Sequence, residues 1–283
     1  MSIAPERSRV VFRNVERDLR GLSSKLGPES VHRFRTSARR LQTLLEDIAP
    51  KRDRHQKKLV KLLGRIRKRA GKVRDLDVQL TTLRALRLPQ DPRRKTQFSH
   101  DLIEQRSRAE KKLKKTLTDE TVREIRKRLK RAGKDFDPAT AADPLTVARQ
   151  ILDPVATVQS PLTEDLLHQH RILTKRARYA TELATDSPEA AILLGQLKHL
   201  QDILGDWHDW LLLTRSASER LGAVHESSLV AALHNVTGAK FRGAVALLSS
   251  KRVAAKTHLA RTEPIQRKES AKTPTRAQTI SAA

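Results

Sequence analysis

Apolar residues recur at helical spacing along almost the whole chain. In the first such segment Val15, Leu19 and Leu22 follow one another at three and four residues, and Gly27-Pro28 ends it. No alternation of polar and apolar residues typical of strands persists, so we predict an all-α protein. The further predicted helices cover residues 29–48, 52–88, 94–130, 144–158, 161–184 and 188–216, and a last one reaches about 259, with an interruption near Gly238 as an alternative.

The helical pattern breaks once inside the chain and stops near its end. The stretch 133–138 contains Gly, Asp and Pro, which is typical of a linker. After Thr262 the chain is polar, contains Pro and has no apolar period, which predicts disorder. We therefore predict a first helical bundle over residues 1–135, a second over 136–262 and a disordered tail over 263–283.

Two motifs occur twice, in the same order. Residues 31–40 (VHRFRTSARR) match 167–176 (LHQHRILTKR) at an offset of 136, so that His32 corresponds to His168. Residues 71–75 (GKVRD) match 205–209 (GDWHD) at an offset of 134. Because two motifs keep their order and nearly their spacing, we interpret the chain as a tandem duplication with about four helices in each copy.

The positive charge is large and unevenly distributed. The chain has a formal net charge of +26. Residues 1–140 hold 40 Lys and Arg against 18 Asp and Glu, whereas residues 141–283 hold 18 against 14. Holding so many cations together costs self-repulsion, which a bound anion relieves. The charge therefore favours a partner with many negative charges.

Composition also excludes several kinds of site. The chain has no Cys, so disulfides, thiolate nucleophiles and Cys-based metal sites are ruled out. No apolar run approaches 18 residues, so we expect no membrane span, and the charged N-terminal stretch does not resemble a signal peptide. The sequence leaves the oligomeric state open.

Cations form a stripe in each copy. His32, Arg35 and Arg39 stand at i, i+3 and i+7, which places them on one side of a helix. The second copy repeats this stripe with His168, Arg171, Lys175 and Arg178. A longer row on the third predicted helix extends over about 27 Å at 1.5 Å per residue, a length that suits a linear polyanion. This row consists of Arg54, Lys58, Lys61, Arg65, Lys68 and Lys72.

Phosphate suits these side chains. Arg presents a fork that meets phosphate oxygens bidentately, Lys is a mobile point charge, and His gains charge as pH falls. The alternative for the rows is a solvated face on a soluble protein. For the two histidines the alternative is a structural hydrogen bond.

Other functions find less support. Asp75 and Asp209 are predicted to be structural, holding the stripe arginines in place, since Asp77 has Leu211 as its counterpart and a symmetric metal site is thereby weakened. No Gly-rich phosphate loop or hydrolase motif is present, so we expect no catalysis and no cofactor. Aromatic residues make up 3% of the chain, which disfavours base stacking but leaves weak, non-specific binding of a nucleic-acid backbone as the alternative function.

Four ordered motifs resemble the CHAD domain, the conserved histidine α-helical domain. His32–Arg40 is similar to its opening signature, and Arg74–Val78 to its second. Leu167–Tyr179 resembles the counterpart in the second half, and Leu200–Asp209 the last motif. Together the motifs place the resemblance over residues from about 5 to about 262.

The resemblance implies two tandem four-helix bundles related by pseudo-two-fold symmetry, with a basic groove or pore between them. It further implies inorganic polyphosphate as the ligand and no catalysis, and some relatives are associated with polyphosphate granules. The absence of Cys fits a reducing cytosol, so we expect a cytoplasmic protein that can associate with such granules. Gln42 replaces a usual basic residue and His208 stands opposite Arg74, so we do not assume equal shares for the two halves. By position, the resemblance assigns to the binding surface His32, Arg35, Arg39, Arg40, Arg74, His168, Arg171, Lys175 and Arg178.

Overall fold

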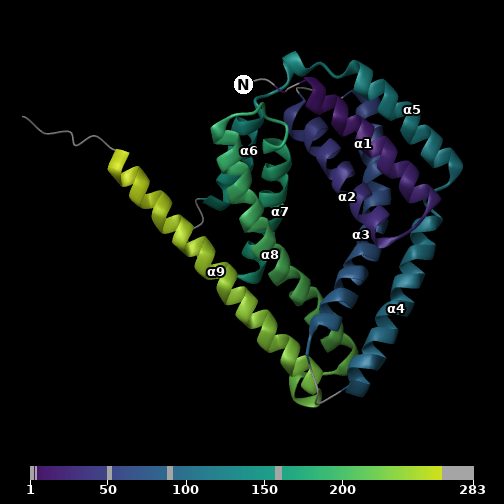
Figure 1. Ribbon diagram of the computed structural model, residues 1–283, viewed down its shortest axis with the longest axis vertical. Helices are drawn as coiled ribbons and strands as arrows, with labels where there is room; N and C mark the ends of the chain where they lie inside the picture. The colour runs from purple at the N-terminus through teal and green to yellow at the C-terminus, as the bar shows by residue number, and fades with distance from the viewer. Residues whose placement is uncertain (1–2, 4, 50–52, 88–91, 157–160, 263–283) are drawn as a thin grey trace, which may run out of the picture. The chain divides into compact units, whose positions relative to one another are not determined.

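The computed structural model describes residues 3, 5–49, 53–87, 92–156 and 161–262, the last twelve of them by their backbone only (Figure 1). Within this part the chain is helical, and an isolated antiparallel bridge between Ile3 and Ala184 is the β-type contact recorded there. The all-α prediction is therefore confirmed, while the predicted disordered tail lies outside the described residues. The helices are α1 (Pro5–Ser24), α2 (Pro28–Thr43), α3 (Arg54–Ala85), α4 (Pro92–Lys114), α5 (Asp119–Asp135), α6 (Pro144–Ala156), α7 (Glu164–Thr181), α8 (Pro188–Leu221) and α9 (Ser228–Thr262).

Contacts divide the chain into two compact units, residues 1–246 and 247–283. The first unit includes residue 135, where the sequence places the boundary between two bundles, so that division stays a prediction. The described part of the second unit is the C-terminal part of α9, and everything that follows concerns the first unit.

Local capping signals explain where α3 begins and why the fourth predicted helix is two helices. Asp53 accepts a hydrogen bond from the backbone N–H of Gln56 at 2.6 Å and starts α3. The single helix predicted over 94–130 was wrong, because α4 ends at Lys114 and α5 begins at Asp119. Thr118 caps α5 by accepting from the N–H of Thr121 at 3.2 Å. In contrast, α9 runs through Gly238 without interruption.

The larger core cluster orients the helices that carry the cationic stripes. Fully buried side chains from α1, α2, α3, α5 and α7 contribute to it, among them Leu19, Phe34 and Leu59. On α2, Val31, Phe34 and Ala38 are buried at helical spacing, so the intervening positions face away from this core. Burying one Leu or Phe side chain contributes about 1.5–3 kcal/mol to stability. Because these apolar side chains must face the core, their burial fixes the rotation of α2 about its axis.

A smaller cluster packs α3 and α4 against α8 and α9. Phe98 of α4 is fully buried there, together with Leu83, Leu213 and Leu233. Figure 1 shows α4 running beside α3, from the neighbourhood of α5 at one end to the α8–α9 turn at the other. This cluster therefore stabilises the end of α3 that lies beyond the first core.

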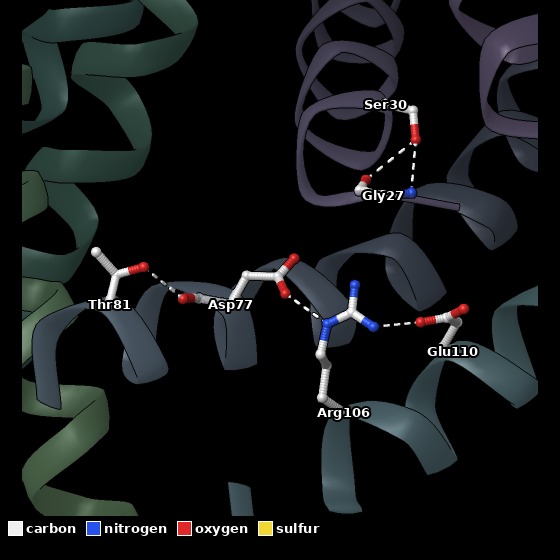
Figure 2. Close-up of polar contacts among 6 residues, drawn as sticks. All are labelled: Gly27, Ser30, Asp77, Thr81, Arg106 and Glu110. Atoms are coloured by element: carbon white, nitrogen blue, oxygen red, sulfur yellow. Dashed lines mark hydrogen bonds and ion pairs between the residues drawn. The ribbon is translucent and has the colours of Figure 1, made fainter. Parts of the chain in front are cut away.

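Asp77 tethers α3 to α4. Arg106 donates from Nε to the Asp77 carboxylate at 2.6 Å and also pairs with Glu110 on its own helix (Figure 2). The Asp77 side chain is only 7% exposed, and its backbone carbonyl accepts from the Thr81 hydroxyl at 3.0 Å. Its place between two helices gives Asp77 a structural role.

Candidate polyanion-binding cavity

A cavity of about 550 Å³ lies among α1, α2, α3, α7 and α8. Its polar lining is dominated by cations, with three carboxylates from Asp18, Asp75 and Asp209 among the described residues. Helices from both predicted halves contribute. The lining cations in the described part of the chain are Arg17, Arg33, Arg35, Arg39, Arg40, Arg74, Arg171, Lys175 and Arg178, with His32 beside them.

The stripe on α2 faces this cavity. His32, Arg35 and Arg39 all line it, as the i, i+3, i+7 spacing predicts. Burial and the neighbouring charge of Arg74 lower the pKa of His32 below its usual value. A neutral His32 can therefore offer a hydrogen bond without adding to the repulsion among the arginines.

The stripe on α7 reaches the cavity through three of its four members. Arg171, Lys175 and Arg178 line it, but His168 does not. Instead, the His168 ring lies against the ring of His208, with centroids 5.0 Å apart. Burial and the charge of Arg171 lower the pKa of His208 to about 3, so this ring stays neutral. In this geometry His168 packs against α8 rather than lining the cavity.

Carboxylates pair with five of the lining arginines, and two of these pairs, Arg17 with Asp18 and Arg33 with Glu29, lie within one helix. Arg35 pairs with Asp75 at 3.4 Å. Glu182 accepts from Arg40 Nε at 2.6 Å and from Arg178 Nη1 at 2.7 Å. The guanidinium carbons of Arg40 and Arg178 also lie 5.8 and 4.9 Å from the centroid of the Tyr179 ring. One carboxylate and one aromatic ring thus fix an arginine from each predicted half.

Four lining cations have no such partner. In the described part of the chain, no carboxylate lies within ion-pair distance of Arg39, Arg74, Arg171 or Lys175. The buried Nε of Arg171 also lacks a hydrogen-bond partner, as does the buried Nε of Arg178 in the same lining. Buried polar atoms of this kind normally find a partner. The cavity therefore presents donors that an anion could satisfy.

Repulsion and burial act together on these cations. Burial, reinforced by the charge of Arg171, lowers the pKa of Lys175 from 10.5 to about 7. Burial also lowers the pKa of Arg171 and of Arg39. Burial raises the pKa of Asp209, although Arg171 and Lys175 oppose this effect. An anion in the cavity would favour the charged forms of these cations and so offset the free energy needed to hold them close together.

The sequence missed several contributors to the cavity. Arg17 and Asn14 come from α1, for which no site was predicted. Arg67 on α3 is not among the lining residues, but it lies near Arg35 and Arg39, and its burial together with their charges lowers its pKa to about 10. Arg67 stands seven residues before Arg74, so the two side chains lie on one face of α3. This spacing is the sequence signal that could have identified Arg67.

The long row predicted on α3 lies elsewhere. None of its six residues lines the cavity, and all six are exposed on α3: Arg54, Lys58, Lys61, Arg65, Lys68 and Lys72. The row therefore does not continue the line of cations that lines the cavity.

The described residues also bear on metal sites and membrane spans. They contain no group of three or more His, Asp or Glu side chains placed to hold a metal ion. None of the helices described combines the length and the apolarity needed to cross a bilayer.

Comparison with known proteins identifies the fold. The family model described as the CHAD domain matches residues 10–218. Among solved structures, the crystal structure of the CHAD domain from the plant Ricinus communis matches with a TM-score of 0.59 and 19% identity, covering 84% of each chain. No curated protein sequence matches the chain significantly.

Proposed function

Because this chain belongs to the CHAD domain family, we propose that it binds inorganic polyphosphate in the cavity without chemically altering it. The observation that carries the proposal is the lining itself, in which Arg and Lys far outnumber carboxylates and four cations lack a counter-ion. Arginine forks suit phosphate oxygens, and a lining of guanidinium groups offers few proton acceptors for catalysis.

A long phosphate chain suits this lining better than a single phosphate. The cations come from α1, α2, α3 and α7, so one small anion can contact only a few of them at once. A linear chain contacts many and releases its counter-ions, which makes binding strong at low salt and steeply salt-dependent. Binding also offsets the burial and the repulsion from Arg171 that lower the pKa of Lys175.

We extend the proposal to a pseudo-two-fold relation between the halves. Arg40 on α2 pairs with Glu182, just after α7. Arg176, at an offset of 136 from Arg40, donates from Nε to Asp47 at 2.7 Å, just after α2. Asp47 stands one residue beyond Glu46, the position that matches Glu182. These two reciprocal ion pairs support the relation, and Gln42 bonds Glu46 as Arg178 bonds Glu182.

Titration with polyphosphates of increasing length tests the proposal. We expect affinity to rise with chain length, to be weak for orthophosphate, and to fall steeply with salt. Replacing Arg35→Gln together with Arg171→Gln removes two cavity contacts and should weaken binding by about ten- to a hundredfold at 0.1 M salt. The matched control, Arg93→Gln with Lys198→Gln, removes equal charge at exposed positions outside the cavity. Equal affinity for short and long chains, or equal losses in both variants, would contradict the proposal.

Non-specific binding of nucleic acid by the same basic residues, in place of polyphosphate, is the alternative. A competition titration separates the two: duplex DNA that displaces polyphosphate at equal phosphate concentration, without the reverse, would favour nucleic acid. Incubation with polyphosphate and divalent metal ions tests the absence of catalysis, since released phosphate would overturn it. Granule association is tested by asking whether a fluorescent fusion follows polyphosphate granules in cells and whether the Arg35/Arg171 variant fails to do so.

A further inference from the structure

A second basic surface lies on α3, outside the cavity. Lys61, Arg65 and Lys68 form its centre, and Arg54, Lys58 and Lys72 continue the same exposed row. Among the described residues, a carboxylate comes within ion-pair distance of this row at Lys58 alone, whose Nζ lies 3.8 Å from Glu124. The row is therefore largely uncompensated.

The row faces away from both the core and the cavity. At 3.6 residues per turn, its centre lies about 100° around the helix from the mean direction of the cavity-lining residues Arg74, Asp75 and Val78, with Lys68 nearest to that face because it stands seven residues before Asp75. The buried stripe that includes Leu59, Ile66 and Val73 occupies the opposite side of α3, with no row residue in it. None of the row residues is in the cavity lining, so a ligand centred on the row uses a different set of cations.

Two of the nearby acidic side chains pair with arginines of their own helices. Glu124 of α5 binds Arg128 at 2.5 Å, and Glu110 of α4 pairs with Arg106. In addition, exposed Arg123 and Lys127 of α5 share a shallow groove with Lys58, and Glu120 and Glu124 also line it. With three cations against two carboxylates, this groove keeps a small positive excess beside the row.

We propose that this outer row binds the phosphate backbone of double-stranded nucleic acid, independently of the cavity. The row is straight and about 27 Å long, enough to cross a major groove about 12 Å wide and reach the phosphates on both sides. A rigid duplex presents two strands of charge to such a face, and a cavity of 550 Å³ cannot admit it. Among the described residues with side chains, no Phe, Tyr or Trp is exposed, so contact to the backbone replaces base stacking.

A polyphosphate chain is a poorer occupant of the row. It is thin and flexible, and it gains more in the cavity, where partial burial strengthens each contact. One molecule can then hold polyphosphate and a duplex at the same time. Variants that neutralise cations on only one of the two surfaces distinguish duplex binding on the row from polyphosphate binding in the cavity.

The test uses the full chain and a fluorescent duplex of about two helical turns. The row variant is Lys61→Gln, Arg65→Gln and Lys68→Gln, which keeps good helix formers. The matched control is Arg93→Gln, Lys198→Gln and Arg242→Gln, with the same net charge. We expect the row variant alone to bind the duplex on the order of a hundredfold more weakly at 0.1 M salt, with its salt slope reduced by about two to three.

The row variant should keep its affinity for polyphosphate, and duplex should bind the polyphosphate-loaded protein without displacing that ligand. Equal duplex affinity in the row and control variants would overturn the inference, as would loss of polyphosphate rather than duplex binding. Loss of duplex binding in the Arg35/Arg171 cavity variant, with the row intact, would also overturn it. Since the duplex assay needs no polyphosphate, failure of the proposed function leaves this test intact.

Discussion

Replacing Lys175 with Met should make the ligand-free protein more stable while weakening its binding of polyphosphate. A fall in pKa from 10.5 to about 7 corresponds to roughly 5 kcal/mol at about 1.4 kcal/mol per pKa unit. Lys175 keeps some exposure, and solvent and relaxation reduce this figure. We expect Lys175→Met to raise the free energy of unfolding by about 1–3 kcal/mol at pH 6.

The gain should depend on pH in a defined direction. The folded-state pKa of Lys175 lies below the unfolded value, so between about pH 7 and 10.5 the unfolded chain binds more protons. The wild-type contribution from this lysine is therefore most destabilising below pH 7 and fades as pH rises through that window. Urea unfolding at pH 6 and near pH 10 should show a large difference between the two proteins at the lower pH and little at the higher one.

Binding supplies the second half of this prediction. A phosphate chain favours the charged form of Lys175, so binding near pH 7.5 should take up protons in the wild type and fewer in Lys175→Met. Calorimetry in buffers of different ionisation enthalpy measures that uptake. A Met variant that is less stable than the wild type at pH 6 would refute the reasoning, because it would show that the lysine is already compensated by its surroundings.

Two further predictions concern the scaffold. Arg106→Gln should lower the free energy of unfolding by about 2–4 kcal/mol, because it leaves the buried Asp77 carboxylate unpaired. The control Arg108→Gln removes an exposed pair with Glu104 and should lower it by about 0.5 kcal/mol or less. Urea titrations of both variants check this, and equal losses of stability would contradict it. Phe98→Ala should lower the free energy of unfolding by about 3–5 kcal/mol. Below its lowered melting temperature the variant should keep its affinity for polyphosphate, because the smaller core cluster does not line the cavity. Weakened binding to the folded variant would contradict this.

Local periodicity was enough to predict the parts of the site that lie on one helix. His32, Arg35 and Arg39 face the cavity because their spacing alone puts them on one side of α2. The break between α4 and α5 was missed because the cationic helical pattern continues up to it, and the short capping signal at Thr118 was overlooked. The role of Arg67 was missed because it depends on which helices come near α3.

Placement between helices was harder to predict from sequence. The α3 row resembles the stripes in spacing, but its direction depends on which face of α3 packs into the core, and that face points it away from the cavity. His168 repeats His32 in sequence, yet His208 on α8 offers it an aromatic neighbour, whereas Arg74 stands at the corresponding position of the first half. A repeat predicts equivalent positions, and the neighbouring helix then decides what each position contacts.

The same physics links the function of the cavity to its stability. Arg171 and Lys175 lack carboxylate partners within ion-pair distance in the described residues, and burial lowers the pKa of both. Pairing each with a nearby carboxylate would stabilise the empty protein but would fill the positions that an anion must occupy. Ligand binding offsets this loss of stability, because a ligand that binds only the folded state stabilises it by about 2.7 kcal/mol when the ligand concentration is a hundred times the Kd. A polyphosphate-binding cavity of this kind should therefore be least stable when empty and should gain most from its longest ligands.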